Sequence, residues 1–223
     1  MVSAIIVAAG SSRRMGFDKL FAPLASQPVI AHSLRAFLDH PLIEEVVLVS
    51  SAGNREKLSA LSNQVRVVDG GPDRCDSVWN GLSGVSSACQ IVAIHDGARP
   101  LIHADSITRG IQAAQEHGAA ALARPVTDTV KRADQSGRVV GSVDRTGLWA
   151  METPQCFRLE LLRAAWEEVR HRHHREGGQA LGRARHQGRQ GGHRSRRRQR
   201  RLSGARQVSQ GRKKATWQQP IRR

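Results

Sequence analysis

Cysteine is scarce in this chain, and long hydrophobic runs are missing. The three cysteines, Cys75, Cys89 and Cys156, are odd in number and far apart, which excludes a disulfide framework and a C-x-x-C metal site. No apolar run approaches the roughly 18 residues of a membrane-spanning helix. The apolar stretch at residues 2–9 is too short for a signal peptide. We therefore expect a protein of the reducing cytoplasm with no membrane span.

Acidic residues are nearly absent from one end of the chain, which concentrates the net charge of +16 there. Residues 171–223 contain 17 of the 35 Lys and Arg residues but only Glu176 of the 19 acidic ones. This segment has no apolar period, and Trp217 is its only Phe, Trp or Tyr. Such a composition cannot bury enough apolar surface to offset chain entropy. We predict a domain at 1–170 and a basic, disordered tail at 171–223, whose binding to nucleic acid would be incidental.

The first 170 residues alternate short apolar segments with amphipathic ones. The former predict buried strands and the latter helices. We expect strands at 4–8, 45–49, 65–68, 90–94 and 119–123, and helices at 29–38, 76–82, 106–116 and 158–169. This order is typical of an α/β fold, here a Rossmann-like, mostly parallel sheet with helices on both faces. Residues 126–153 break the alternation, and we interpret them as a protruding β-arm.

Three loops with small or charged residues follow expected strands, at 9–14, 69–71 and 95–96. In parallel sheets, ligands bind beyond the carboxyl ends of the strands, where these loops would meet. The first loop combines small residues, which let backbone N–H groups approach phosphates, with Arg13, Arg14 and Lys19. It is neither a Walker A loop nor a dinucleotide-binding G-x-G-x-x-G. The pattern indicates a phosphate-binding site at one edge of the sheet.

Several motifs then occur in a fixed order. They are A-A-G-S-S-R-R-M-G-F-D-K at 8–19, D-G-G-P-D-R-C-D-S-V at 69–78, H-D-G-A-R-P at 95–100, P-V-T-D-T-V-K at 125–131, V-D-R at 143–145 and T-P-Q-C-F at 153–157. The first resembles the nucleotide-sugar pyrophosphorylase superfamily. Together, over residues 4–158, they resemble the 2-C-methyl-D-erythritol 4-phosphate cytidylyltransferases, which implies a fold of the nucleotide-diphospho-sugar transferase type.

The resemblance implies a reaction of CTP with methylerythritol 4-phosphate that gives the CDP-linked product and pyrophosphate, with Mg²⁺. It assigns the charge-stabilising catalytic role to Arg14 and Lys19, together with Arg145, and the Mg²⁺ ligand to Asp96. The matching nucleotide-binding residues are Ala8, Ala9, Gly10, Gly71 and Ser77, and the matching sugar-phosphate-binding residues are Arg99, Thr129, Arg145 and Thr153. In the family, the threonine and arginine of the arm reach a second subunit. A homodimer with 126–153 as the exchanged arm is therefore implied.

Simpler roles and a second substrate stay open. A ribitol 5-phosphate cytidylyltransferase is built on the same loop. Asp96 could cap a turn, and Asp76 or Ser77 could cap the following helix. We interpret His95 as a structural hydrogen-bonding residue rather than a base, because phosphate monoesters need no strong base at neutral pH.

The match ends after Leu162. The family continues with a T-D-[DE] segment and an N-[IL]-K-[IV]-T motif, whose lysine helps to position the sugar phosphate, and neither occurs here. Arg, Gly, His and Gln become abundant near residue 170, inside an expected helix. We interpret this as a change of reading frame near codon 170. The loss of a strand, a closing helix and a substrate lysine predicts low stability and weak or absent activity.

We expect the coding DNA, translated in its other two frames past codon 170, to yield N-[IL]-K-x-T. Two His codons before an Arg codon, as at His173, His174 and Arg175, encode Ile or Thr twice when read one base later, which fits the missing threonine segment. Sequencing this region checks the idea. Absence of the motif from both frames excludes the frame change, and near-normal turnover by a stable purified chain would contradict the expected loss of activity.

Overall fold

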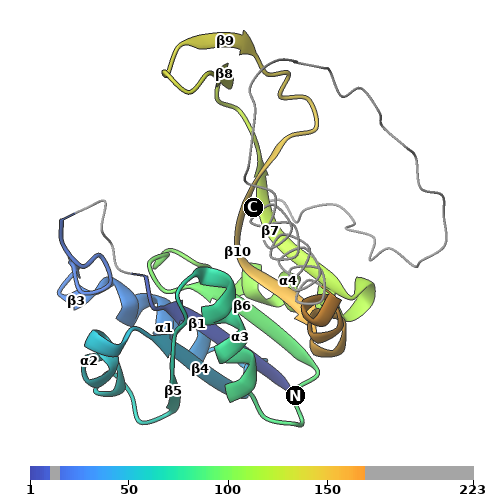
Figure 1. Cartoon of the computed structure of the whole chain (residues 1–223). Coiled ribbons are helices and arrows are strands. Elements are labelled where there is room, and N and C mark those ends of the chain that lie inside the picture. The colour runs from blue at the N-terminus through green and yellow to red at the C-terminus, as the bar shows by residue number, and fades with distance from the viewer. Residues whose placement is uncertain (11–15, 169–223) are drawn as a thin grey trace, which may run out of the picture. The chain divides into compact units, whose positions relative to one another are not determined.

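The computed structural model describes residues 1–10 and 16–168. Its centre is a six-stranded sheet with the order β5-β4-β1-β6-β10-β7 (Figure 1). The strands are β1 (Val2–Ala8), β4 (Glu45–Ser50), β5 (Val65–Asp69), β6 (Ile91–Asp96), β7 (Ala119–Pro125) and β10 (Trp149–Arg158). β1 is parallel to β4 and β6, and β4 is parallel to β5, whereas β10 is antiparallel to β6 and β7. The predicted mostly parallel sheet is confirmed.

Helices cover both faces of this sheet, as the sequence predicts. The main apolar cluster joins Ala4, Ile6 and Ala8 of β1 to α1 (Val29–Leu38), α2 (Arg55–Ser59) and α4 (Ala104–His117). On the other face, α3 (Arg74–Gly84) approaches β1 so closely that a Cβ at Gly81 would lie 2.6 Å from Ile5 Cγ2. Short elements complete the first half: the hairpin β2 (Pro23–Leu24) and β3 (Gln27–Pro28), and the 3-10 helix η1 (Ala52–Asn54).

The predicted β-arm connects β7 to β10 (Figure 1). In it, β8 (Lys131–Ala133) pairs antiparallel with β9 (Val139–Ser142) as a separate two-stranded sheet. The Asp134 carboxylate closes the turn by accepting hydrogen bonds from the N–H groups of Ser136 (2.9 Å) and Arg138 (3.0 Å). The arm is thus a hairpin with its own turn.

The strand β10 is the main difference from the expected fold. The sequence analysis assigned residues up to Thr153 to the arm and predicted no strand before the helix at 158–169. Instead, Trp149–Arg158 pairs with both β6 and β7, and residues 159–168 are helical. Polar residues and a proline hide this strand, because the pattern lacks the apolar run of its neighbours. The arm therefore ends before residue 149.

The described residues fall into two units. The first contains residues 1–161, and the second is represented by 162–168. The domain boundary predicted at residue 170 and the predicted tail at 171–223 lie outside the described residues. No helix in the described part of the chain is long and apolar enough to cross a membrane. All three cysteines are free.

Candidate active site

The carboxyl ends of the parallel strands bring three predicted loops together. Ala8 at the end of β1 pairs with Ser50, which pairs with Asp69 of β5. On the other side, Val7 pairs with Asp96 of β6. This edge, formed by residues 8–10, 69–71 and 95–99, is called the C-terminal edge below. It lies where the strand order reverses at β1, the usual ligand site of such sheets.

Close backbone packing joins the 69–71 loop to β1 and α3. A Cβ at Gly70 would lie 2.3 Å from the Cβ of Ala9, and one at Gly71 would lie 2.2 Å from the Cβ of Asp76. Neither position has room for a side chain. The Ser77 hydroxyl, which is buried, accepts a hydrogen bond from the Gly71 N–H at 3.1 Å. The small residues of D-G-G thus let the loop lie directly on the start of α3.

The helix α3 begins earlier than predicted. Its N-cap is Asp73, whose carboxylate accepts a hydrogen bond from the Asp76 N–H at 3.0 Å. The alternative that Asp76 or Ser77 caps this helix is wrong, because both lie inside its first turn. The Ser77 hydroxyl donates to the Asp73 carbonyl oxygen at 2.8 Å. Ser77 therefore links the loop before the helix to the cap of the helix.

The Asp96 carboxylate lies between two arginines. Arg74 Nη2 is 3.0 Å from Oδ1, and Arg99 Nε is 3.0 Å from Oδ2. The side chain of Asp96 is 30% exposed, so it is accessible from solvent. Arg74 had no role in the sequence analysis, although it is the arginine of the D-G-G-x-x-R motif. Its place in the first turn of a helix that starts at the C-terminal edge was the available signal.

His95, at the end of β6, is fully buried. Its Nε2 lies 3.1 Å from the Arg99 carbonyl oxygen, its Nδ1 lies 2.9 Å from Thr153 Oγ1, and its ring centroid is 4.9 Å from that of Phe37. Burial lowers the pKa of His95 from 6.5 to about 4, although the Arg99 carbonyl and the Asp96 carboxylate act in the opposite direction. His95 is thus neutral at pH 7 and structurally hydrogen-bonded, in line with the prediction.

Thr153 reaches the C-terminal edge from β10 and is 5% exposed. Its Oγ1 accepts a hydrogen bond from the Asp96 N–H at 3.3 Å. The structure therefore brings together a first group of predicted residues from β1, α3, β6 and β10 and the loops that follow the parallel strands. These are Ala8, Ala9, Gly10, Gly71, Ser77, Asp96, Arg99 and Thr153.

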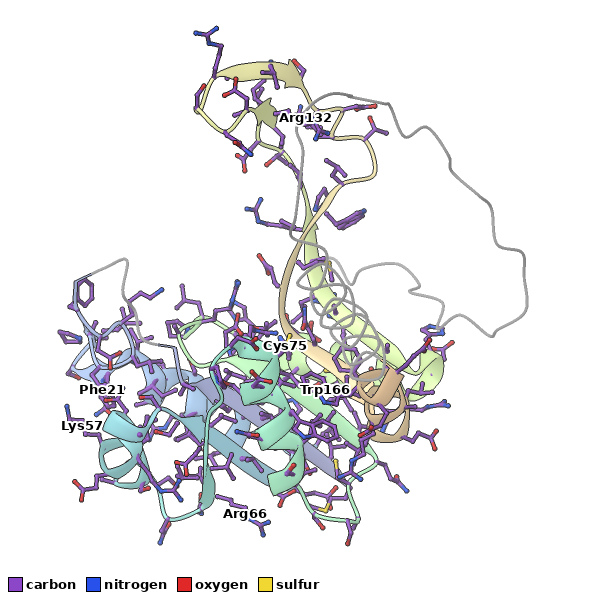
Figure 2. All side chains as sticks on the ribbon, in the orientation of Figure 1. Phe21, Lys57, Arg66, Cys75, Arg132 and Trp166 are labelled. Carbon is purple, nitrogen blue, oxygen red and sulfur yellow. The ribbon has the colours of Figure 1, made fainter. Side chains whose placement is uncertain are left out.

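The segment that carries Lys19 is attached next to this edge. The Asp18 carboxylate accepts hydrogen bonds from the Leu20 N–H (3.0 Å) and from Asn54 Nδ2 (2.7 Å), and Asn54 belongs to η1, which follows β4. The Lys57 ammonium lies 5.4 Å from the Phe21 ring centroid. Both side chains are labelled in Figure 2. Lys19 itself is exposed. Arg14 lies outside the described residues.

Thr129 and Arg145 form a second group, on the arm. Both side chains are exposed. The Arg145 guanidinium donates a hydrogen bond to the Thr127 carbonyl oxygen, and the Val143 N–H donates to the Val130 carbonyl oxygen at 3.0 Å. These contacts hold the two predicted residues on neighbouring segments of the arm rather than at the C-terminal edge.

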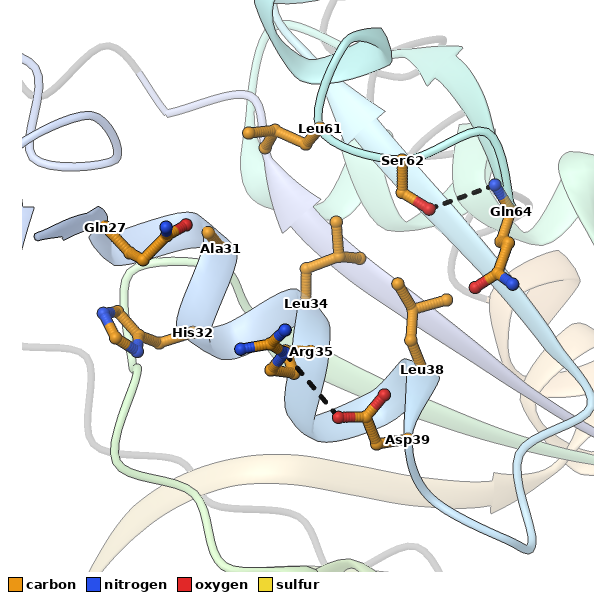
Figure 3. A pocket seen from close by; sticks show the side chains of 10 residues that line it. All are labelled: Gln27, Ala31, His32, Leu34, Arg35, Leu38, Asp39, Leu61, Ser62 and Gln64. Carbon is orange, nitrogen blue, oxygen red and sulfur yellow. Dashed lines mark hydrogen bonds and ion pairs between the residues drawn. The ribbon is translucent and has the colours of Figure 1, made fainter.

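A cavity of about 290 Å³ lies away from these groups, beside α1 (Figure 3). Its walls come from α1, Gln27 and residues 61–64, and include the Arg35–Asp39 ion pair at 3.8 Å. None of the predicted site residues lines it. The candidate site is therefore the C-terminal edge, where charged and small residues from separate motifs meet.

Comparisons with known proteins point to one family. The model of the family described as "IspD: 2-C-methyl-D-erythritol 4-phosphate cytidylyltransferase" matches residues 2–190. A protein of that name from Symbiobacterium thermophilum is 44% identical over 174 residues, which is 75% of this chain and 73% of the relative. Its counterpart from Alkaliphilus metalliredigens is 41% identical over 177 residues, with the same coverage.

Solved structures agree with these relatives. The crystal structure of 2-C-methyl-D-erythritol 4-phosphate cytidylyltransferase from Thermus thermophilus is similar with a TM-score of 0.64 and 28% identity, covering 80% of this chain and 83% of that one. The 4-diphosphocytidyl-2C-methyl-D-erythritol synthase from Anaerococcus prevotii has a TM-score of 0.66 and 26% identity, covering 76% of each chain.

We expect Ser77→Ala to lower the free energy of unfolding by about 1–2 kcal/mol, because it leaves the Gly71 N–H without its partner. The matched control is Ser83→Ala on the same helix, whose exposed hydroxyl donates only to the Trp79 carbonyl oxygen four residues earlier. That change should stay within about 0.5 kcal/mol. Denaturant unfolding measures both, and equal effects would contradict the role given to Ser77.

Proposed function

The chain belongs to the IspD family of 2-C-methyl-D-erythritol 4-phosphate cytidylyltransferases, and we propose that it transfers CMP from CTP to methylerythritol 4-phosphate with release of pyrophosphate. The observation that carries the proposal is the meeting of Gly71, Ser77 and Asp96 beside two arginines at the C-terminal edge. Relatives named for methylerythritol phosphate favour this substrate over ribitol 5-phosphate. The three free cysteines suit a reducing cytoplasm, where we place the reaction.

We assign the cytosine and ribose to the small residues of the C-terminal edge, namely Ala8, Ala9, Gly10, Gly71 and Ser77. The close contacts of Ala9 with Gly70, and of Gly71 with Asp76, support this assignment. They leave backbone amides and carbonyls, rather than long side chains, as the groups that face a ligand. A pyrimidine edge offers donors and acceptors that such backbone groups can pair with.

The triphosphate needs positive charge at the α-phosphate, where negative charge builds up during in-line attack. We assign this task to Arg14 and Lys19. An arginine offers a planar pair of donors and a lysine a compact point charge, so the two can bind different phosphate oxygens. The contacts of Asp18 with Asn54 support the position of Lys19, because they attach its segment to the end of β4.

We further propose that Asp96 holds Mg²⁺. A single carboxylate that shares the ion with phosphate and water oxygens is normal for Mg²⁺, and the described residues contain no cluster of three or more metal-ligating side chains. Arg74 donates to Oδ1 of Asp96 through both Nε (3.2 Å) and Nη2 (3.0 Å), whereas Oδ2 accepts from Arg99 Nε, so a lone pair of Oδ2 is available to a cation. When bound, the ion neutralises charge on the nucleotide phosphates. Arg74 and Arg99 orient the carboxylate through their ion pairs.

The acceptor would be bound by Arg99 and Thr153 from the C-terminal edge and by Thr129 and Arg145 from an arm. Its phosphate oxygen attacks the α-phosphorus of CTP, and pyrophosphate leaves on the opposite side. A phosphate monoester dianion needs no strong base. The buried, neutral His95 is compatible with this chemistry, since it is not available to take a proton from the acceptor.

We expect Asp96→Asn, made in a chain with the reading frame restored, to lower kcat/KM by about 100-fold or more relative to that chain, because it removes the charge that holds the ion and orients the arginines. The matched control is Asp105→Asn, which breaks the exposed Asp105–Arg109 pair on α4 and should leave kcat/KM unchanged. Pyrophosphate release from CTP is measured with each sugar phosphate. A chain with the reading frame restored serves as reference.

Two results would overturn the proposed function. One is faster pyrophosphate release with ribitol 5-phosphate than with methylerythritol 4-phosphate. The other is equal loss of activity in Asp96→Asn and Asp105→Asn.

We also propose a homodimer in which the arm of one subunit completes the site of the other. Exposed apolar side chains support an interface on the arm and its base: Val139 (61% exposed), Val140 (56%), Leu148 and Met151. Thr129 and Arg145 are held on the arm, apart from the group at the C-terminal edge. A second subunit offers a way to unite the two groups.

We expect a mixture of the Arg145→Ala and Asp96→Asn chains to regain activity that neither has alone. A mixed dimer contains one site with an intact Asp96 and an intact arm from its partner. Random exchange in a symmetric dimer should therefore restore about a quarter of the original activity. The two chains are mixed, allowed to exchange and assayed for pyrophosphate release. No recovery, with exchange shown by tagged subunits, would mean that Arg145 acts within its own subunit.

A further inference from the structure

His95 is the one buried titratable group at the C-terminal edge that the proposed chemistry does not use. Its two ring nitrogens contact two different segments, the turn at 96–99 and the strand β10. The hydrogen-bond partners determine which nitrogen carries the proton. A backbone carbonyl can only accept, so Nε2 donates to the Arg99 oxygen at 3.1 Å. In the neutral ring, Nδ1 is then an acceptor.

The position of the proton on the His95 ring determines which group donates in the next two hydrogen bonds. Because Nδ1 accepts, the Thr153 hydroxyl donates its hydrogen to it across 2.9 Å. The Thr153 oxygen in turn accepts the Asp96 N–H at 3.3 Å. These three bonds form one directed chain from the Asp96 amide through Thr153 and His95 to the Arg99 carbonyl. We call it the His95 relay.

The geometry points to His95 as a positioning residue for the reaction. We propose that the His95 relay fixes the orientation of the Thr153 hydroxyl and the shape of the 96–99 turn, and thereby the placement of Asp96 and Arg99. The catalytic consequence rests on the proposed function, whereas the relay itself does not. In this arrangement the Thr153 hydroxyl has no hydrogen left for a ligand. It can meet the acceptor only by accepting a hydrogen bond, as from a sugar hydroxyl.

Further contacts keep the turn rigid around this ring. The Arg99 N–H donates to the Asp96 carbonyl oxygen at 3.0 Å, and the Gly97 N–H donates to the Val7 carbonyl oxygen at 2.9 Å. The buried Ser33 hydroxyl donates to the Gly97 carbonyl oxygen at 2.8 Å. With the backbone held in this way, the side chains of Asp96 and Arg99, three residues apart, form an ion pair at 3.0 Å. The His95 ring and the Asp96 N–H both contact Thr153 of β10, so they connect this turn to that strand.

The chain contains a matched control in His40, which is also buried. His40 Nε2 lies 3.2 Å from the Ala104 carbonyl oxygen and 3.0 Å from Thr108 Oγ1, and its Nδ1 accepts the Leu42 N–H at 3.2 Å. It therefore bonds like His95, but to α4 and to the loop after α1, away from the C-terminal edge. His40→Gln should lower the melting temperature and leave kcat/KM for the sugar phosphate unchanged.

Substitution of His95 by glutamine or asparagine distinguishes the roles of its two ring nitrogens. His95→Gln can still donate to the Arg99 carbonyl but loses the acceptor for Thr153, whereas His95→Asn keeps that acceptor and loses the donor. We expect each to lower kcat/KM for the sugar phosphate by about 10- to 100-fold. Thr153→Val should have an effect of similar size, because it removes the hydroxyl but keeps the branched shape. Thr153→Ser, which keeps the hydroxyl, should restore most of the loss.

A double-mutant cycle provides the decisive kinetic test. His95→Gln and Thr153→Val remove the same bond, so the double variant should be no worse than the poorer single one. The losses from His95→Asn and Thr153→Val should multiply, because asparagine retains the bond that valine removes. Multiplication in the first pair, or a kcat/KM loss in His40→Gln as large as that in His95→Gln, would overturn the proposal.

A spectroscopic test on the full chain needs no enzymatic activity. We expect ¹⁵N NMR of the His95 ring at pH 7, assigned by the signal missing from His95→Asn, to show a protonated Nε2 and an unprotonated Nδ1. The opposite tautomer or a doubly protonated ring overturns the inference even if the enzyme is active. If the tautomer is as expected but a chain with the reading frame restored releases no pyrophosphate, the proposed function fails and the relay stands.

Discussion

The hydrogen bond between Thr153 and His95 joins the antiparallel strand β10 to the end of the parallel strand β6 across 58 residues of sequence. The contribution of β10 to the candidate site depends on this connection. The parallel strands by themselves bring the loops at 8–10, 69–71 and 95–99 to one edge. The insertion of β10 between β6 and β7 then adds a hydroxyl to that edge and connects it to the arm.

Paired charges surround Asp96 at this edge. Asp96 has an arginine on each carboxylate oxygen, so these three side chains together carry a net positive charge. A third cation at His95 would lie beside Arg99 in a buried position, and burial keeps this ring neutral. The protein can therefore use histidine for its two directed hydrogen bonds without adding a charge. Arg74 of α3 and Arg99 of the turn after β6 hold the Asp96 carboxylate, so its orientation depends on both segments.

Strongly periodic segments were predictable from local pattern. The helix expected at 29–38 is α1, with the same bounds, and the apolar segments beginning at 45 and 65 are β4 and β5. Each of these elements has a hydrophobic pattern that matches one geometry only. The strand β10 was missed because Glu152, Thr153 and Gln155 do not form an apolar run. The backbone hydrogen bonds of β10 are made with two neighbouring strands. What makes residues 149–158 a strand therefore lies in β6 and β7 rather than in the segment itself.

The amino-acid sequence was sufficient for the fold class and for the family, because periodicity and motif chemistry are local properties of the chain. It did not reveal that Arg74 pairs with Asp96, that Asp73 caps α3 or that the His95 ring contacts Thr153 of β10. These features arise between residues that are distant in sequence or depend on the start of a helix. Only the packing of α3 against β1 and the register of β10 on β6 bring the atoms within hydrogen-bonding distance, and neither is encoded in any short segment.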